Sequence, residues 1–106
     1  MADAPLTPVV FHVLLALSDG PLHGYAIMRA VDNTAGGAIA TGPGMVYGTL
    51  RRLEASGLVR ETAARDDRRR RFTLTAAGRR ALAAEAARLT HLSQLVRAHG
   101  LAPEKS

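Results

Sequence analysis

Cysteine is absent from this chain of 106 residues, tryptophan is absent too, and the aromatic residues are two tyrosines and two phenylalanines. Without thiols the protein can form neither a disulfide framework nor a zinc site built from thiolates. This usage fits a reducing compartment, and we expect the cytoplasm. The length is that of one small domain, for which association with a second copy would be favourable.

Long hydrophobic runs are also missing. The apolar stretch from Val9 to Leu17 is far too short to cross a bilayer, and the first ten residues lack the basic region of a signal peptide. We therefore expect a soluble intracellular protein with no membrane partner.

Acidic residues are few, nine against fourteen basic ones, and the formal charge is +5. This balance favours a polyanionic partner such as nucleic acid. The carboxylates show no clustering typical of a catalytic pocket, no nucleophile stands beside a base, and the histidines lack metal-ligand spacing. The sequence thus predicts no enzyme activity, no metal and no cofactor.

The central feature that is present is an amphipathic helix between Thr41 and Gly57. Pro43 suits its first turn, where the missing N–H needs no partner, and Gly57 ends it. One stripe of the helical wheel is apolar and consists of Val46, Leu50 and Leu53. The opposite side is small and basic and consists of Gly44, Gly48, Arg51 and Ala55. Such a face can approach a nucleic acid closely.

Periodicity and turn residues predict the other elements. They are a helix over 8–18, a second helix from 24 to about 33, strands over 58–62 and 71–74, and a final helix over 76–98. The first two helices are joined by a turn at Asp19 to Pro21, and Thr75 caps the final one. The predicted fold is mainly α with a small β-hairpin: a winged helix-turn-helix domain over 1–74, then a C-terminal dimerisation helix and tail over 75–106.

Arginine side chains gather in two neighbouring elements. Arg51 and Arg52 belong to the central helix, and the hairpin tip, turning at Asp66 and Asp67, supplies further candidates, namely Arg65, Arg68, Arg69 and Arg70. A helix in the major groove with a hairpin along the adjacent backbone or minor groove would suit double-stranded DNA. The alternative for the basic run is an ordinary solvated loop.

Two further residues leave alternatives open. Tyr47 lies on the flank of the central helix, where its hydroxyl could reach a phosphate or its ring could be part of the core. His23 begins the second helix, and capping or packing competes there with a phosphate contact.

The final helix repeats apolar residues every seven positions, at Leu82, Leu89 and Val96, with Leu92 between them. This spacing is typical of helix pairing and predicts a homodimer, to which Phe11 and Leu15 of the first helix would contribute. The alternative is an amphipathic helix lying on a membrane, which the mixed charges of the helix do not favour.

Three motifs together resemble the PadR family of bacterial transcriptional regulators. They are the HGY triplet at His23 to Tyr25, the pattern P-G-x-x-Y-x-x-L-x-x-L-E-x-x-G-L from Pro43 to Leu58, and L-T-x-x-G-R from Leu74 to Arg79. The single short C-terminal helix is similar to that of the compact subgroup of the family. The resemblance implies a dimeric winged helix protein, usually a repressor, whose last helix packs against the partner's first and last helices.

The resemblance also assigns positions. It places Met45, Tyr47, Gly48, Arg51 and Arg52 on the DNA-reading helix and Arg68 to Arg70 in the wing, and Tyr25 and Gly44 join the DNA-binding candidates. The chain departs from the family pattern at three positions. Gly42 stands where serine is more usual, Met45 replaces a threonine, and Gly48 replaces a proline, serine or alanine. Hydroxyl-to-phosphate contacts at those positions are therefore not expected here.

We thus predict a sequence-specific DNA-binding regulator that acts as a homodimeric repressor on a two-fold symmetric operator. A protein-interaction module that binds an acidic partner is the alternative. A small-molecule effector would need an aliphatic pocket at the dimer interface, near Phe11, Leu15, Leu89 or Leu92, because an aromatic sandwich cannot be built without tryptophan. The sequence specifies neither the operator, nor the regulated genes, nor the sign of regulation.

Overall fold

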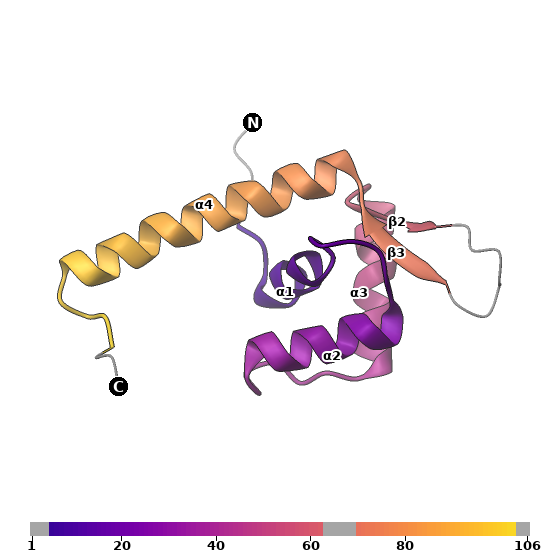
Figure 1. Ribbon diagram of the computed structural model, residues 1–106, viewed down its shortest axis with the longest axis horizontal. Coiled ribbons are helices and arrows are strands. Elements are labelled where there is room, and N and C mark those ends of the chain that lie inside the picture. The colour runs from indigo at the N-terminus through magenta and orange to yellow at the C-terminus, as the bar shows by residue number, and fades with distance from the viewer. Residues whose placement is uncertain (1–4, 63–69, 104–106) are drawn as a thin grey trace.

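The computed structural model describes residues 5–62 and 70–103, and Figure 1 shows how its elements are arranged. In chain order they are α1 (Pro8–Ala16), β1 (Leu22–His23), α2 (Gly24–Ala35), α3 (Pro43–Ala55), β2 (Val59–Thr62), β3 (Arg71–Leu74) and α4 (Ala76–Ala98). Helices α1, α2 and α3 pack together beside a small sheet, and α4 runs across α1 and projects beyond it (Figure 1). The predicted fold class is confirmed.

The core lies between these three helices and the sheet. Its buried side chains are Val13, Leu14, Leu17, Ile27, Val31, Val46, Leu50, Leu53, Val59, Phe72 and Leu74. The apolar stripe predicted for the central helix is therefore buried. Burying a side chain of this size contributes roughly 1.5–3 kcal/mol relative to leaving it in water, so the cluster is the main source of stability.

Local signals set the helix ends. Thr7 caps α1 by accepting a hydrogen bond from the backbone N–H of Val10 (3.2 Å), and the helix ends two residues earlier than predicted. Just after its end, the Ser18 hydroxyl donates to the Leu15 carbonyl (2.7 Å), one of the carbonyls of the last turn. Helix α2 runs two residues further than predicted, to Ala35, and Gly36 after it takes the left-handed conformation (φ 59°) that ends helices.

Strand β1 is the element that the sequence did not predict. Leu22 pairs with Phe72 and His23 with Arg71, so the sheet has three antiparallel strands in the order β1-β3-β2. Two residues are too few to show the alternation that identifies a strand, and only the partner strand makes them one. The prediction of a two-stranded hairpin was thus incomplete. The hairpin pair itself is confirmed, with Val59 opposite Leu74 and Thr62 opposite Arg71.

Helix α4 begins as predicted at a threonine cap. The Thr75 hydroxyl accepts from the Gly78 N–H (3.0 Å) and donates to the Gly57 carbonyl (2.6 Å), which fastens the start of α4 to the end of α3. Gly78 is buried so close to the backbone carbonyl of Leu58 that a side chain there would overlap it. Within the described ranges 5–62 and 70–103, no helix is long and apolar enough to span a membrane.

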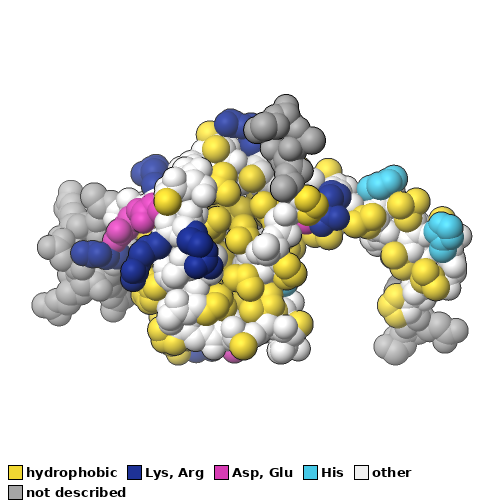
Figure 2. All heavy atoms as spheres, turned by 180° about the vertical axis from the view of Figure 1, so that it is seen from behind, with side chains coloured by type: hydrophobic (Ala, Val, Ile, Leu, Met, Phe, Trp, Pro, Cys, Tyr) yellow, Lys and Arg dark blue, Asp and Glu magenta, His cyan; other side chains and the backbone are white. Residues whose placement is uncertain are grey.

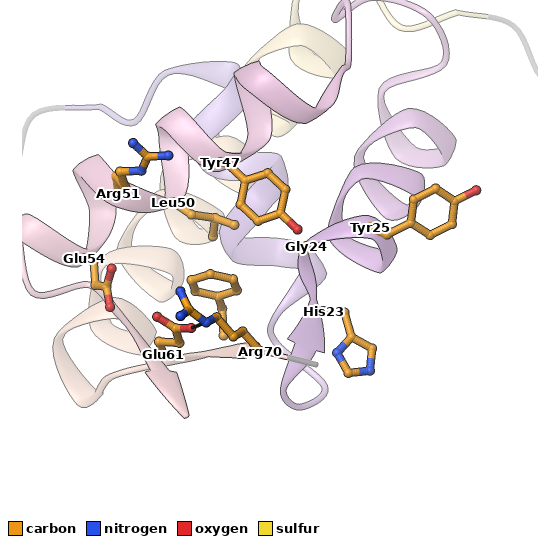
Figure 3. Close-up of a pocket in the computed structure, with 10 residues that line it drawn as sticks. His23, Gly24, Tyr25, Tyr47, Leu50, Arg51, Glu54, Glu61 and Arg70 are labelled. Atoms are coloured by element: carbon orange, nitrogen blue, oxygen red, sulfur yellow. Dashed lines mark ion pairs between the residues drawn. The ribbon is translucent and has the colours of Figure 1, made fainter. Parts of the chain in front are cut away.

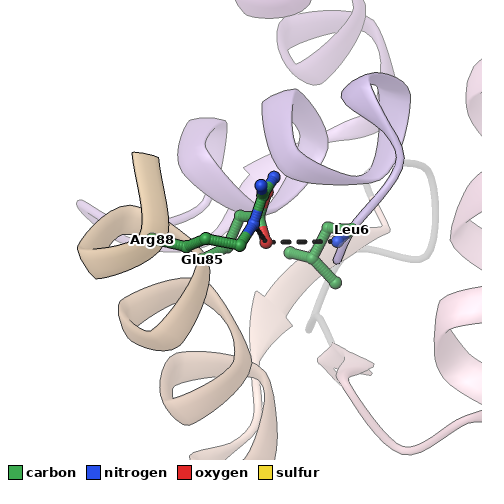
Figure 4. A network of polar contacts seen from close by, with 3 residues as sticks. All are labelled: Leu6, Glu85 and Arg88. Carbon is green, nitrogen blue, oxygen red and sulfur yellow. Dashed lines mark hydrogen bonds and ion pairs between the residues drawn. The ribbon is translucent and has the colours of Figure 1, made fainter. Parts of the chain in front are cut away.

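A carboxylate on α4 fastens the segment that precedes α1 (Figure 4). Glu85 is only 5% exposed and accepts from the Leu6 backbone N–H (3.2 Å) and from Arg88 Nε (3.1 Å). The hydrogen bond from Arg88, helped by the one from Leu6, lowers the pKa of Glu85 below its ordinary value despite partial desolvation. The hydrogen bond between Leu6 and Glu85 therefore joins two segments that are far apart in sequence.

Candidate nucleic-acid interface

Three of the four residues predicted for the small, basic face of α3 are exposed, namely Gly44, Arg51 and Ala55, and Arg52, Tyr47 and the acidic Glu54 are exposed as well. Thr49 is buried, with its hydroxyl donating to the Met45 carbonyl (2.8 Å). Arg52 donates from Nη2 to Thr49 Oγ1 (3.2 Å), so its guanidinium group lies back along its own helix. Arg51 makes no such contact within the described part of the chain.

Two residues of the predicted reading helix are less accessible than expected. Met45 is half-buried and packs against the core, with its sulfur 3.8 Å from Thr49 Oγ1. Gly48 is half-buried and lies beside the Arg52 guanidinium group. Both remain DNA-binding predictions, although Met45 already has a structural role within the subunit.

Tyr47 bridges α3 and α2. Its ring lies on Gly24, the first residue of α2, so closely that a methyl group on Gly24 would overlap the ring and the hydroxyl. The side chain nevertheless stays 43% exposed. Both sequence alternatives for Tyr47 therefore hold in part, because one side of the ring packs on protein and the rest faces solvent.

A cleft of about 550 Å³ lies between α3, the start of α2 and the hairpin (Figure 3). It gathers five of the predicted DNA-binding residues, namely His23, Tyr25, Tyr47, Arg51 and Arg70. Its remaining walls are Gly24, Leu50, Glu54, Glu61 and Phe72. Side chains from three separate segments thus meet at one concave surface, and arginines gather at the same end of the molecule (Figure 2).

The residues of the HGY motif have different surroundings at this cleft. Tyr25 is 62% exposed, points away from Tyr47 and lies against the Arg29 guanidinium group, 6.0 Å from the ring centroid (Figure 3). His23 is half-buried, caps α2 without a side-chain hydrogen bond, and its Nδ1 has no partner among the described residues. Capping by the His23 side chain, one of the predicted alternatives, is therefore not observed.

Two acidic residues line the cleft that sequence reasoning did not single out. Glu54 belongs to α3 and Glu61 to β2, and Glu61 Oε2 lies 3.2 Å from Arg70 Nε. The sequence could have pointed to Glu61, because alternation along the strand places this carboxylate on the same side as the apolar Val59. The predicted residues Arg65, Arg68 and Arg69 lie outside the described residues, as does the predicted turn at Asp66 and Asp67.

The predicted dimer residues divide into two groups. Leu15, Leu89, Leu92 and Val96 are each 37–40% exposed, and Phe11 is half-buried. Leu82 differs, since it packs partly against the core of its own subunit, and its place in an interface stays a prediction. Within residues 5–62 and 70–103 no cluster of three potential metal-binding side chains occurs.

Comparison with solved structures supports the architecture. A PadR family transcription regulator from Clostridium difficile matches with a TM-score of 0.72 over 88% of this chain and 98% of its own, at 16% identity. The regulator BpsR of Bordetella bronchiseptica, whose DNA binding is regulated by 6-hydroxynicotinic acid, matches with a TM-score of 0.69 and 28% identity, over 89% of this chain and 67% of its own. These similarities establish the winged helix fold.

Comparison of sequences is more specific. An uncharacterised 37.1 kDa protein in a transposon of Streptomyces fradiae is 51% identical over 81 residues, which are 76% of this chain but 23% of that protein. The chain thus spans under a quarter of this relative's length. The model of the PadR-like family of transcriptional regulators matches residues 13–84, from within α1 through the hairpin into α4. The chain belongs to this PadR-like family of transcriptional regulators.

Proposed function

We propose that the protein binds double-stranded DNA as a homodimer and represses transcription from a two-fold symmetric operator. The observation that supports this most directly is the cleft, which brings Tyr47 and Arg51 of α3 and Arg70 of the hairpin to one surface. With α3 in the major groove, the hairpin would follow the neighbouring backbone. Arginine forks match both phosphate oxygens and guanine edges.

The projecting half of α4 supports the homodimer. Leu89, Leu92, Leu95 and Val96 are each 37–42% exposed along a helix whose first half packs on its own subunit. Figure 2 shows hydrophobic side chains along this projecting part and on the flank of the body that faces it. A second α4, with Phe11 and Leu15 of the partner's α1, would cover this surface. Two subunits would then place their α3 helices about 34 Å apart, one turn of DNA.

Relief of repression by a small molecule is part of the proposal. A ligand acts on DNA binding only if it favours one spacing of the two α3 helices over the other. In the proposed dimer, apolar side chains line the seam between α4 and the partner's α1, so apolar compounds are the candidates. Calorimetry across aliphatic and aromatic compounds, with and without DNA, would detect them. If no compound that binds changes the affinity for DNA, this part of the proposal is wrong.

Selection of bound DNA from a random pool tests the proposed function. We expect an enriched motif with two-fold symmetry and half-sites about one helical turn apart. Recovery of no motif, together with no retention of any duplex at moderate salt, would contradict it.

Arg51→Ala then tests the reading face. We expect weaker binding of the selected duplex by about 1–3 kcal/mol and reduced discrimination against altered half-sites, measured by fluorescence anisotropy. Arg60→Ala is the matched control, because Arg60 is exposed on β2 and alternation places it on the side of the strand opposite Glu61. Equal weakening of selected and random duplexes by Arg51→Ala would instead assign Arg51 to the backbone.

A further inference from the structure

Carboxylates are unexpected on a surface that is to meet DNA phosphates. Glu54 and Glu61 nevertheless line the same cleft as Arg51 and Arg70. Glu61 is the less exposed member of its ion pair, with 30% of its side chain accessible against 76% for Arg70. It is anchored in the sheet, where it stands opposite Phe72 in the β2–β3 register. A fixed carboxylate thus holds a long, exposed cation.

The geometry of the ion pair leaves Arg70 able to bind a second anion. The contact with Glu61 Oε2 is made by Arg70 Nε at 3.2 Å. A guanidinium group carries five N–H donors, and four of them are on the two terminal nitrogens. Those terminal nitrogens form the fork that pairs with two oxygens of a phosphate. Arg70 can therefore bind Glu61 and a phosphodiester at the same time.

We propose that Glu61 is a positioning residue for DNA binding: it holds Arg70 through Nε so that the terminal nitrogens meet a backbone phosphate crossing the cleft. This inference rests on the proposed function. If α3 occupies the major groove and the hairpin follows the adjacent backbone, one strand must pass over the cleft between them. Fixing Arg70 beforehand lowers the side-chain entropy lost on binding. Glu61 then strengthens DNA binding although it carries a negative charge.

Simple electrostatics predicts the opposite effect of Glu61 on DNA affinity, which makes the inference testable. If Glu61 only repelled DNA or competed with phosphate for Arg70, its removal would strengthen binding. If it positions Arg70, Glu61→Ala weakens binding. Glu61→Gln removes the charge but keeps an oxygen that can accept from Nε, so it retains much of the wild-type affinity.

The test is fluorescence anisotropy with one duplex of about 30 base pairs, three helical turns, taken from the selected pool and titrated at several salt concentrations. We expect Glu61→Ala to weaken binding about two- to fivefold per bound subunit, the range of a surface ion pair, and Glu61→Gln to recover most of this loss. Arg70→Ala should reduce the slope of log affinity against log salt by about 0.9 per lost phosphate contact. In the Arg70→Ala background, Glu61→Ala should have no further weakening effect.

Glu54→Ala is the matched control, since it removes the same charge from the same cleft on an exposed α3 position, where no ion pair to another described residue is found. It should leave affinity equal or stronger. Thermal unfolding verifies that each variant is folded. Stronger binding by both Glu61 variants, or equal effects of Glu61→Ala with and without Arg70, would overturn the inference alone. A folded wild-type protein that binds no duplex would instead remove the proposed function, and the inference with it.

Discussion

At the scale of single residues, two glycines decide how the elements meet. Gly78 lets α4 lie against the Leu58 carbonyl, and Gly24 lets the Tyr47 ring lie on the start of α2. Neither has a positive φ, so each glycine is required by close approach and not by backbone conformation. The motifs HGY and L-T-x-x-G-R therefore have a packing reason as well as a family resemblance.

Gly78→Ala should destabilise the fold by about 1–3 kcal/mol, because the added methyl group meets a backbone carbonyl that cannot rotate away. Urea unfolding measures the loss. Gly48→Ala is the control: its methyl group would meet only the Arg52 Nη1 atom at 3.7 Å, and alanine is the better helix former by about 1 kcal/mol. Equal stability of both variants would refute this explanation of Gly78.

Gly24→Ala should move the Tyr47 ring, because the flexible side chain yields more easily than the backbone. In a Tyr25→Phe background, Tyr47 is the one tyrosine left in the chain, so its fluorescence reports on its surroundings. We expect greater quenching by acrylamide and weaker DNA binding in the Gly24→Ala variant. Unchanged quenching would show that the ring does not depend on Gly24.

At the scale of elements, two hydrogen bonds connect segments whose contact the hydrophobic pattern does not predict. Thr75 joins the end of α3 to α4, and Glu85 joins α4 to the residue before the α1 cap. Neither contact is local in sequence. Both contacts hold α4 against its own subunit.

The Glu85 contact makes stability depend on pH. In the folded protein, hydrogen bonding to Arg88 lowers the pKa of Glu85 below its ordinary value of 4.5. As the pH falls, the unfolded chain therefore takes up a proton at this residue before the folded protein does. The contribution of Glu85 to folding stability is fully present at pH values above its ordinary pKa. It is lost as the pH falls through the lowered pKa of the folded protein. Urea unfolding between pH 7 and pH 3 should show a difference between wild type and Glu85→Gln that shrinks with acidification. A constant difference would contradict this assignment.

At the scale of the whole molecule, the shape is uneven because α4 extends past the body. The chain measures 51 × 35 × 21 Å, and the residues of the second half of α4, from 86 to 98, are all exposed. Exposed apolar side chains at helical spacing favour association. In the proposed dimer, this seam also fixes the distance between the two reading helices.

Leu92→Asp should abolish the dimer, because a charge would replace an apolar contact at the centre of the seam. Analytical ultracentrifugation should then give a monomer with the same helical content and much weaker binding of a two-half-site duplex. Thr90→Asp places the same residue on the opposite side of the helix and should leave the dimer intact. A wild-type protein that is monomeric at high micromolar concentration would contradict the homodimer itself.

By itself, the sequence determined the helices, the hairpin strands, the buried stripe of α3 and the family, because periodicity, caps and turn residues are properties of short segments. The tertiary structure decided what depends on contacts between distant segments: the two-residue strand β1, the close approach at Gly78, the Tyr47–Gly24 contact and the carboxylates in the cleft. Glu61 is the clearest case. Along the sequence it is one acidic residue in a short strand, and only the folding of the hairpin places it beside Arg70.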